Sequence, residues 1–136
     1  MKTSAFFIAA LLMAAGSASA LSVENYRKVK LQSESADEMD AKIARLILTG
    51  YFQGVEEVIF GQRSGTNSPI KVTGDLQACV PQTVVVNSDL LRAALDQEIG
   101  VHGKVYADIP DWEQSYAANY ALLGLARMFP CRSNMR

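Results

Sequence analysis

The sequence predicts an all-α protein, a small bundle of about three to five helices closed by one disulfide bond. Three segments carry apolar residues at three- and four-residue steps, which is the spacing of one face of a helix. The chain also contains two cysteines, Cys79 and Cys131, and each lies close to a proline. The helical segments predict the fold class, and the cysteine pair predicts how the fold is closed.

The first 20 residues have the layout of a secretory signal peptide. Lys2 provides a positive start, residues 6–15 are apolar, and Ala18-Ser19-Ala20 supplies the small residues of a cleavage site. The apolar stretch is about ten residues long, whereas a membrane span needs roughly 20. We therefore expect cleavage after Ala20, a periplasmic location without membrane attachment, and a single helical domain over residues 21–136.

Charge is spread evenly along the chain, with a formal net value of −1. A protein that binds nucleic acid presents a clustered basic face, and no segment of this sequence provides one. The charge pattern therefore predicts a chain with no nucleic-acid partner.

Residues 21–33 fit a short strand, a helical turn or a surface arm, and the sequence leaves the choice open. Three segments with helical periodicity follow. A capping box at Ser35-Ala36-Asp37-Glu38 predicts the start of a long helix. Its expected core face consists of Met39, Ile43, Leu46, Ile47, Gly50, Gly54, Val55, Val58 and Ile59. Each glycine weakens a helix by up to about 1 kcal/mol, so their place on this face predicts a closely packed neighbouring helix.

The middle of the chain begins with a polar stretch at residues 62–77, which predicts a loop with an extended segment near residues 70–74. Residues 83–86 resemble a short strand. Asn87-Ser88-Asp89 is expected to cap a second helix that ends at Gly100 and Gly103, with Leu90, Leu91, Ala94, Leu95 and Ile99 facing inward. A third helix is expected from Pro110 to Pro130, with Trp112, Tyr116, Tyr120, Leu123 and Met128 on one broad face.

Cys79 and Cys131 are expected to form a disulfide, because an exported chain enters an oxidising compartment. The bond would close a loop of about 50 residues and contribute on the order of 4 kcal/mol through chain entropy. A structural zinc site is the rival interpretation, but two cysteines and one distant histidine supply too few ligands. A redox pair would need the Cys-x-x-Cys spacing, which is absent.

No pattern in the sequence predicts an enzyme, a cofactor or a metal site. His102, the single histidine, lies among glycines and is expected on a flexible surface turn without a catalytic partner. Glu56 and Glu57 are consecutive, so on a helix their side chains point about 100° apart and do not share a site. The glycine-containing residues 61–74 lack the Gly-Lys-Ser/Thr ending of a phosphate-binding loop.

Three short motifs occur in the order found in a known family. Tyr51-Phe52-Gln53-Gly54-Val55 is similar to a helical Tyr-x-x-Gly-Val motif, Cys79-Val80-Pro81 to Cys-x-Pro, and the chain's Phe129-Pro130-Cys131 to the end of a terminal helix. Together, over residues 39–131, they resemble the Rap/Tai family of type VI secretion amidase immunity proteins. The resemblance implies a small exported helical protein with paired cysteines, which binds and inhibits a secreted cell-wall amidase toxin.

Two segments depart from the family pattern, namely the long loop at residues 62–77 and residues 100–111, which replace a short His-Pro-Glu connection. Exposed loops carry recognition on a fixed scaffold, so these segments are the expected partner contacts. Residues 100–108 are favoured, with His102, Lys104, Tyr106 and Asp108 as contact residues, because tyrosine is a frequent interface anchor. The alternative function is a general periplasmic helical binding or stress-tolerance protein without a toxin partner. The sequence does not decide between a monomer and a homodimer.

Overall fold

A computed structural model of the chain describes residues 21–63, 65 and 68–131, so the expected signal peptide lies outside the described residues. The elements are α2 (Val23–Ser33), α3 (Glu38–Gln62), β1 (Ile70–Thr73), β2 (Leu76–Ala78), α4 (Ser88–Tyr106), the short 3-10 helix η1 (Trp112–Gln114) and α5 (Ala117–Met128). The predicted small bundle of helices with one disulfide is confirmed. The fold is not purely α, because β1 and β2 pair as an antiparallel hairpin.

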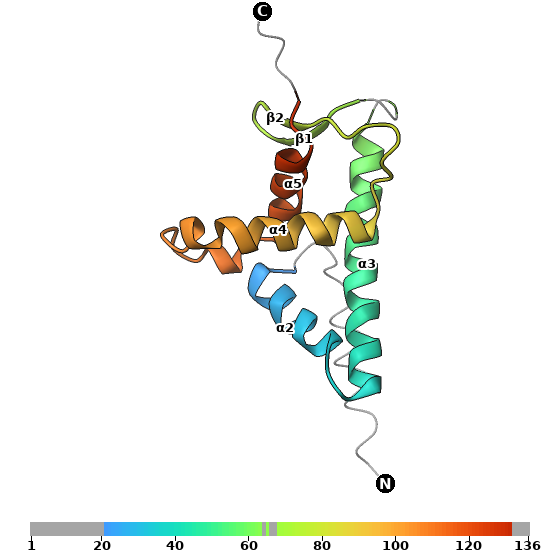
Figure 1. Cartoon of the computed structure of the whole chain (residues 1–136), viewed down its shortest axis with the longest axis vertical. Coiled ribbons are helices and arrows are strands. Elements are labelled where there is room, and N and C mark those ends of the chain that lie inside the picture. The colour runs from blue at the N-terminus through green and yellow to red at the C-terminus, as the bar shows by residue number, and fades with distance from the viewer. Residues whose placement is uncertain (1–20, 64, 66–67, 132–136) are drawn as a thin grey trace, which may run out of the picture.

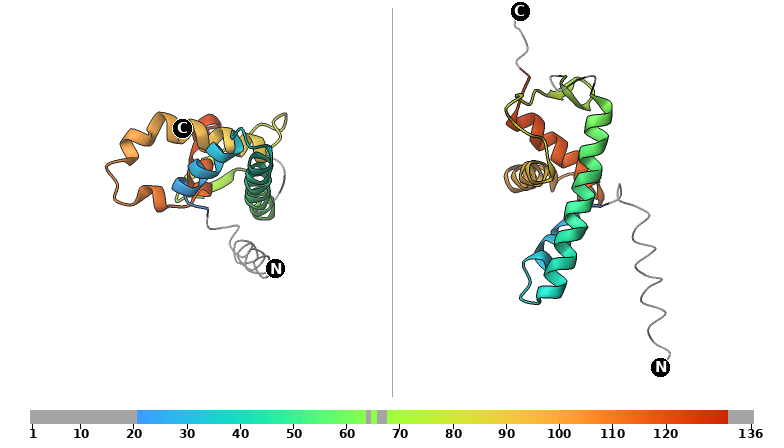
Figure 2. Two further views of the ribbon diagram at one scale, coloured as in Figure 1. Left: turned by 90° about the horizontal axis from the view of Figure 1, so that it is seen from below. Right: turned by 90° about the vertical axis from the view of Figure 1, so that its right-hand side faces the viewer.

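The helices form two pairs that cross each other (Figures 1 and 2). Helix α2 packs along the first half of α3, and α4 packs on α5. Helix α4 crosses α3 near its own beginning, and its far end projects from the rest of the molecule (Figure 1). None of the helices described is long and apolar enough to cross a bilayer.

Residues 21–33, for which the sequence left a strand, a helical turn and a surface arm open, contain helix α2. The hydroxyl of Ser22 caps it by accepting a hydrogen bond from the Asn25 N–H at 3.2 Å. Val23 and Tyr26 are fully buried, so two apolar contacts in the first turn hold the helix in place. Backbone hydrogen bonds from Val23 N to Ser115 O (3.0 Å) and from Ala117 N to Leu21 O (2.8 Å) tie its start to the start of α5.

Helix α3 begins two residues later than the capping box predicts. Asp37, rather than Ser35, is the N-cap, and its carboxylate accepts from the N–H groups of Met39 (2.9 Å) and Asp40 (3.0 Å). The Ser35 hydroxyl instead accepts from the Asp37 N–H at 3.2 Å. Aspartate is as good an N-cap as serine, and its charge also suits the positive end of the helix dipole.

The predicted core face of α3 is wrong in most of its members. The buried residues are Ala41, Ala44, Leu48, Tyr51, Phe52 and Ile59, of which the prediction contained only Ile59. Small alanines let α2 lie close, and Phe52 packs edge-on against Tyr26 with ring centroids 5.9 Å apart. The predicted face, by contrast, is largely exposed to solvent.

The close helix contact expected at Gly50 and Gly54 occurs at another glycine. A Cβ atom built at either position would meet nothing within 4 Å. At Gly124 of α5, a Cβ atom would lie 2.1 Å from the carbonyl oxygen of Ala94 in α4. Gly124 therefore permits the close approach on which the α4–α5 pair depends.

Helix α4 starts at the expected place and continues further than expected. The Asn87 side chain accepts from the Leu90 N–H at 2.9 Å, which confirms the predicted cap. Gly100 and Gly103 do not end the helix, which runs on to Tyr106. Of the predicted inward residues, Leu91, Ala94 and Leu95 are fully buried and the other two are packed against the core.

Two further boundary predictions are wrong. Residues 83–86 form a turn rather than a strand, although Val86 is buried. The last helix begins at Ala117 rather than at Pro110, which lies in a turn before η1. Trp112 and Tyr120 are buried as expected, whereas Tyr116 is 53% exposed because it precedes the helix as its N-cap.

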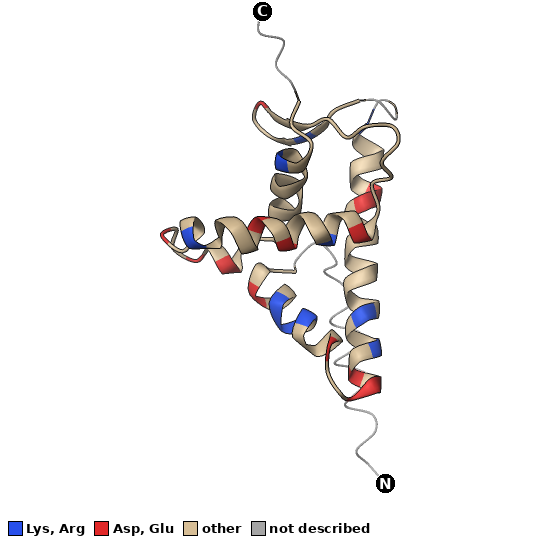
Figure 3. Ribbon diagram, viewed as in Figure 1, with Lys and Arg blue, Asp and Glu red and all other residues tan. Residues whose placement is uncertain are grey.

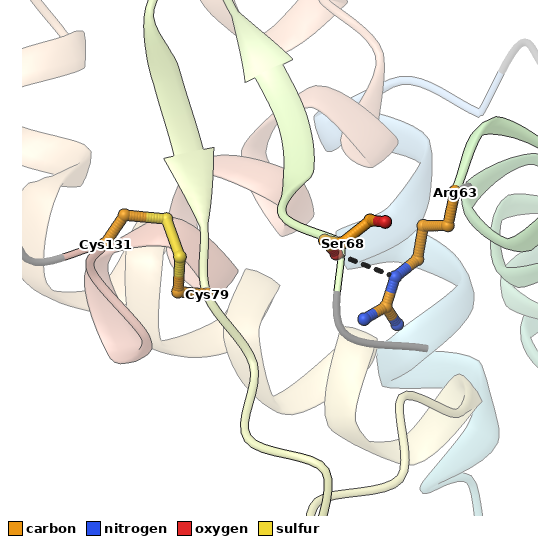
Figure 4. Close-up of a disulfide and its surroundings, with 4 residues drawn as sticks. All are labelled: Arg63, Ser68, Cys79 and Cys131. Atoms are coloured by element: carbon orange, nitrogen blue, oxygen red, sulfur yellow. Dashed lines mark hydrogen bonds between the residues drawn. A yellow bond between two sulfur atoms is a disulfide. The ribbon is translucent and has the colours of Figure 1, made fainter. Parts of the chain in front are cut away.

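The predicted disulfide joins Cys79, just after β2, to Cys131, just after α5 (Figure 4). The Cα atoms are 4.8 Å apart, and the Cys79 N–H donates to Phe129 O at 2.8 Å. On the other side of the hairpin, the Arg63 Nε–H donates to Ser68 O at 3.0 Å (Figure 4). The hairpin thus connects the end of α3 to the end of α5.

Candidate functional site

The end of α4, the following turn and η1 form a projection at residues 100–114, which we call the α4 tip (Figure 1). All four predicted partner-contact residues lie in it. The tip is helical as far as Tyr106 and then turns, with the Ile109 N–H donating to Tyr106 O at 2.8 Å. It is therefore an ordered element rather than the flexible loop that the glycines suggested.

A buried carboxylate lies at the base of the tip. Glu98 is only 1% exposed, and a carboxylate in such a place is stable only when it is paired and hydrogen-bonded. The hydroxyl of Tyr106 donates to Glu98 Oε1, and Arg127 Nε lies 3.0 Å from the same carboxylate. Glu98 therefore joins the tip to α5, and sequence reasoning missed it.

His102 lies on α4 one turn after Glu98, so the expectation of a flexible surface turn is wrong. Its Nδ1 atom is 3.3 Å from Glu98 Oε2, which is within ion-pair distance when the imidazole is protonated. The Nδ1 atom is buried and makes no hydrogen bond to any described residue. The geometry makes His102 part of the support beneath the tip.

Aromatic rings form the second support of the tip. The ring of Tyr106 packs against Trp112 (centroids 5.6 Å apart) and against Tyr120 (4.9 Å). Arg27 of α2 lies over the Trp112 ring at 5.1 Å and also pairs with Glu113. Burial, and then the hydrogen bond to Glu98, raise the pKa of Tyr106. Tyr106 therefore contributes to the packing of the tip through both its ring and its hydroxyl.

The outer surface of the tip carries exposed apolar groups that sequence reasoning also missed. Val101 and Val105 are each 65% exposed and Ile109 is 51% exposed. Val101 and Val105 lie one helical turn apart on α4, and Ile109 lies in the turn that follows the helix; we call these three exposed residues the tip ridge. Lys104 and Asp108 are exposed next to them, and Figure 3 shows both signs of charge on the tip. The four-residue spacing would have identified the ridge had Gly100 and Gly103 not indicated a helix end.

A separate hollow of about 390 Å³ lies between α2 and α4, lined by Tyr26, Arg27, Lys30, Leu31, Glu34, Asp96 and Ile99. Asp96 accepts hydrogen bonds from Tyr26 Oη and Lys30 Nζ, both at 2.7 Å. Burial, followed by the contact with Asp96, raises the pKa of Tyr26. These polar groups connect α2 to α4, so the hollow is explained by the fold.

Metal binding has no candidate within the described part of the chain, where no three His, Cys, Asp or Glu side chains are grouped to hold an ion. Comparison with models of known protein families, with curated proteins and with solved structures finds no match for this chain. The tip ridge consists of exposed apolar side chains on a projection of the described chain.

Proposed function

We propose that this chain is an exported immunity protein that binds and inhibits a type VI secreted peptidoglycan amidase, with the α4 tip as its contact surface. The carrying observation is an exposed apolar ridge on a projection whose base is fixed by Glu98 and by aromatic rings packed edge to face. A rigid projection loses little conformational entropy on binding, which favours its insertion into a cleft of the partner. The proposed role is binding rather than catalysis.

The three motifs that resemble the Rap/Tai family support the proposal, because all of them lie in the part of the fold that holds the helices together. The Tyr51 hydroxyl accepts from the Ala118 N–H at 3.0 Å, which joins α3 to α5. Cys79 and Cys131 join the hairpin to the end of α5. The motifs therefore belong to the scaffold, whereas residues 100–111, which depart from the family pattern, belong to the tip. A shared scaffold with a variable projection suits a family whose members bind different partners.

Within the tip, the predicted contact residues take different roles in this proposal. Val105, with the rest of the tip ridge, forms the apolar centre of the contact, and Lys104 and Asp108 form its charged rim. His102 and Tyr106 support the ridge from below through Glu98.

The first test is co-expression in the periplasm with any amidase encoded beside this gene, followed by lysis and pull-down measurements. Val105→Glu should abolish protection and weaken binding at least about tenfold, because it places a charge at the apolar centre of the contact. Val85→Glu is the matched control, since Val85 is 71% exposed and lies outside the tip. Circular dichroism should show both variants folded.

The proposal is wrong if the wild-type chain neither binds nor protects against any amidase encoded nearby. A general periplasmic helical binding or stress-tolerance protein is then the remaining candidate. Equal protection by the two glutamate variants would remove the tip ridge from the contact.

A further inference from the structure

The Nδ1 atom of His102 is buried at the base of the α4 tip, yet it makes no hydrogen bond to any described residue. Buried polar atoms in proteins are nearly always hydrogen-bonded, so an exception needs a physical reason. One turn earlier on α4, the Oε2 atom of Glu98 lies 3.3 Å from this nitrogen. The carboxylate therefore acts on one particular nitrogen of the imidazole.

The position of Glu98 favours a proton on Nδ1. A neutral imidazole carries a single proton, and the group beside each ring nitrogen decides which of the two holds it. Without a proton, Nδ1 would direct its lone pair at a carboxylate oxygen, and two acceptors repel each other. Tyr106 donates to Oε1, and Arg127 bonds the same carboxylate from α5, so Oε2 has a lone pair left for the Nδ1 proton. Neutral His102 is then the Nδ1–H tautomer.

The opposite edge of the ring is the part of His102 that reaches solvent. The side chain is 30% exposed while Nδ1 is buried, so the exposed edge is the one that carries Nε2. In the Nδ1–H tautomer, Nε2 has no proton and accepts a hydrogen bond. His102 and Val105 are three residues apart on α4, so they are neighbours on the helix surface. The tip thus presents a hydrogen-bond acceptor beside its apolar ridge.

We propose that Nε2 of His102 is the acceptor through which the tip selects its partner, and that Glu98 is the positioning residue that keeps Nε2 unprotonated. This inference rests on the proposed function, because the matching group belongs to the amidase cleft that receives the tip ridge. That group is an N–H or O–H donor in the wall of the cleft.

The apolar surroundings of Nε2 make the match selective. Contact with the tip ridge removes water from His102, so a partner without a donor at this place leaves Nε2 buried and unpaired. An unpaired buried polar atom is more unfavourable than a formed hydrogen bond is favourable. An amidase with an apolar side chain or a carboxylate opposite Nε2 is therefore rejected.

The tautomer is measured first, in the free protein. Long-range proton–nitrogen NMR at about pH 8, where histidine is ordinarily neutral, distinguishes the two forms. His102 is the single histidine of the chain, so its signals need no assignment. We expect a proton on Nδ1 and a lone pair on Nε2, whereas a histidine in water prefers its proton on Nε2. A proton on Nε2, alone or together with one on Nδ1, overturns the proposal.

Two substitutions then separate contact through Nε2 from support of Glu98. The amide of glutamine reaches the place of Nε2, whereas the shorter amide of asparagine reaches the place of Nδ1 and still donates to Glu98. His102→Gln should keep the affinity for the amidase within about threefold, and His102→Asn should weaken it at least about tenfold. A residue that only supports Glu98 predicts the reverse order. Thermal melts should show both variants folded.

The wild type and the two variants test different statements. A wild type that binds no amidase contradicts the proposed function, while the Nδ1–H signature in the same protein would still support the acceptor oriented by Glu98. If an amidase binds the wild type and both variants equally, or binds His102→Asn more tightly than His102→Gln, selection through Nε2 is wrong and the proposed function stands.

Discussion

Glu98 lies at the base of the α4 tip and connects α4 to α5. Its neighbours come from both of them, with Tyr106 and His102 on α4 and Arg127 on α5. A carboxylate at 1% exposure needs these partners, because an unpaired buried charge is strongly destabilising. Substitutions at Tyr106 or Arg127 should therefore lower the free energy of unfolding, because each removes a partner of this buried carboxylate.

The donor from Tyr106 can be removed without changing the shape of the ring. Tyr106→Phe should lower the free energy of unfolding by about 1–3 kcal/mol, because Glu98 then loses one of its hydrogen bonds. Urea denaturation measures this change. Tyr116→Phe, at a residue that is 53% exposed, is the control and should stay within about 0.5 kcal/mol of the wild type. Equal effects of the two changes would mean that the hydrogen bond to Glu98 contributes little.

Tyr106→Phe should also change how the free energy of unfolding depends on alkaline pH. The pKa of Tyr106 is raised by burial, so the folded state holds the phenol proton more tightly than the unfolded state does. This contribution is fully present below about pH 10, the ordinary pKa of tyrosine, and is lost as the pH rises through the folded pKa. The wild type should therefore lose stability above about pH 10 more steeply than Tyr106→Phe.

At the scale of the elements, α3 shows where sequence reasoning succeeds and where it stops. Its periodicity identified a helix, but both of its sides carry large apolar residues: Tyr51 and Phe52 are buried, whereas Met39 and Leu46 are exposed. An exposed apolar face has the same residue spacing as a core face, so periodicity alone cannot distinguish them. The sequence likewise singled out residues 100–108 but missed the ridge, because Gly100 and Gly103 indicated a helix end before Val105. It missed Glu98 because the contact of Glu98 with Arg127 arises only through the packing of α4 on α5.

Local rules succeeded where a single neighbouring group decides the structure, as at the Asn87 cap. They failed at Gly100 and Gly103, where packing of α4 against its neighbours outweighs a helix penalty of about 1 kcal/mol for each glycine.

Two helical glycines should therefore respond in opposite directions to the same change. Gly100→Ala should raise the free energy of unfolding by about 0.5–1 kcal/mol, because the position is helical, exposed and open around its Cβ. Gly124→Ala should lower it by about 1–3 kcal/mol, because the new Cβ would lie 2.1 Å from Ala94 O. Chemical denaturation of both variants in parallel checks the pair. Destabilisation by Gly100→Ala would show that α4 ends where the sequence suggested.

In the whole molecule, two helix pairs are held together by separated contacts. Tyr26 and Lys30 of α2 meet Asp96 of α4, while Tyr51 of α3 meets the Ala118 N–H of α5. The disulfide, which the sequence correctly located, joins the hairpin to α5 at one end of the molecule, and the tip projects from another side (Figure 1). The disulfide and the proposed contact surface thus lie in different regions of the fold.

This separation predicts that the disulfide can be removed with the tip left intact. Cys131→Ser should lower the free energy of unfolding by about 2–5 kcal/mol under oxidising conditions, because the unfolded chain is no longer constrained by the bond to Cys79. Thermal melts with and without a strong reductant check this, and the two proteins should melt alike once the wild-type bond is reduced. At temperatures well below its melting point, Cys131→Ser should bind the tip's partner as tightly as the wild type does, since Glu98 and its neighbours are untouched. Weaker binding by a variant shown to be folded would mean that the bond also orders the tip, and stability and recognition would then depend on one another.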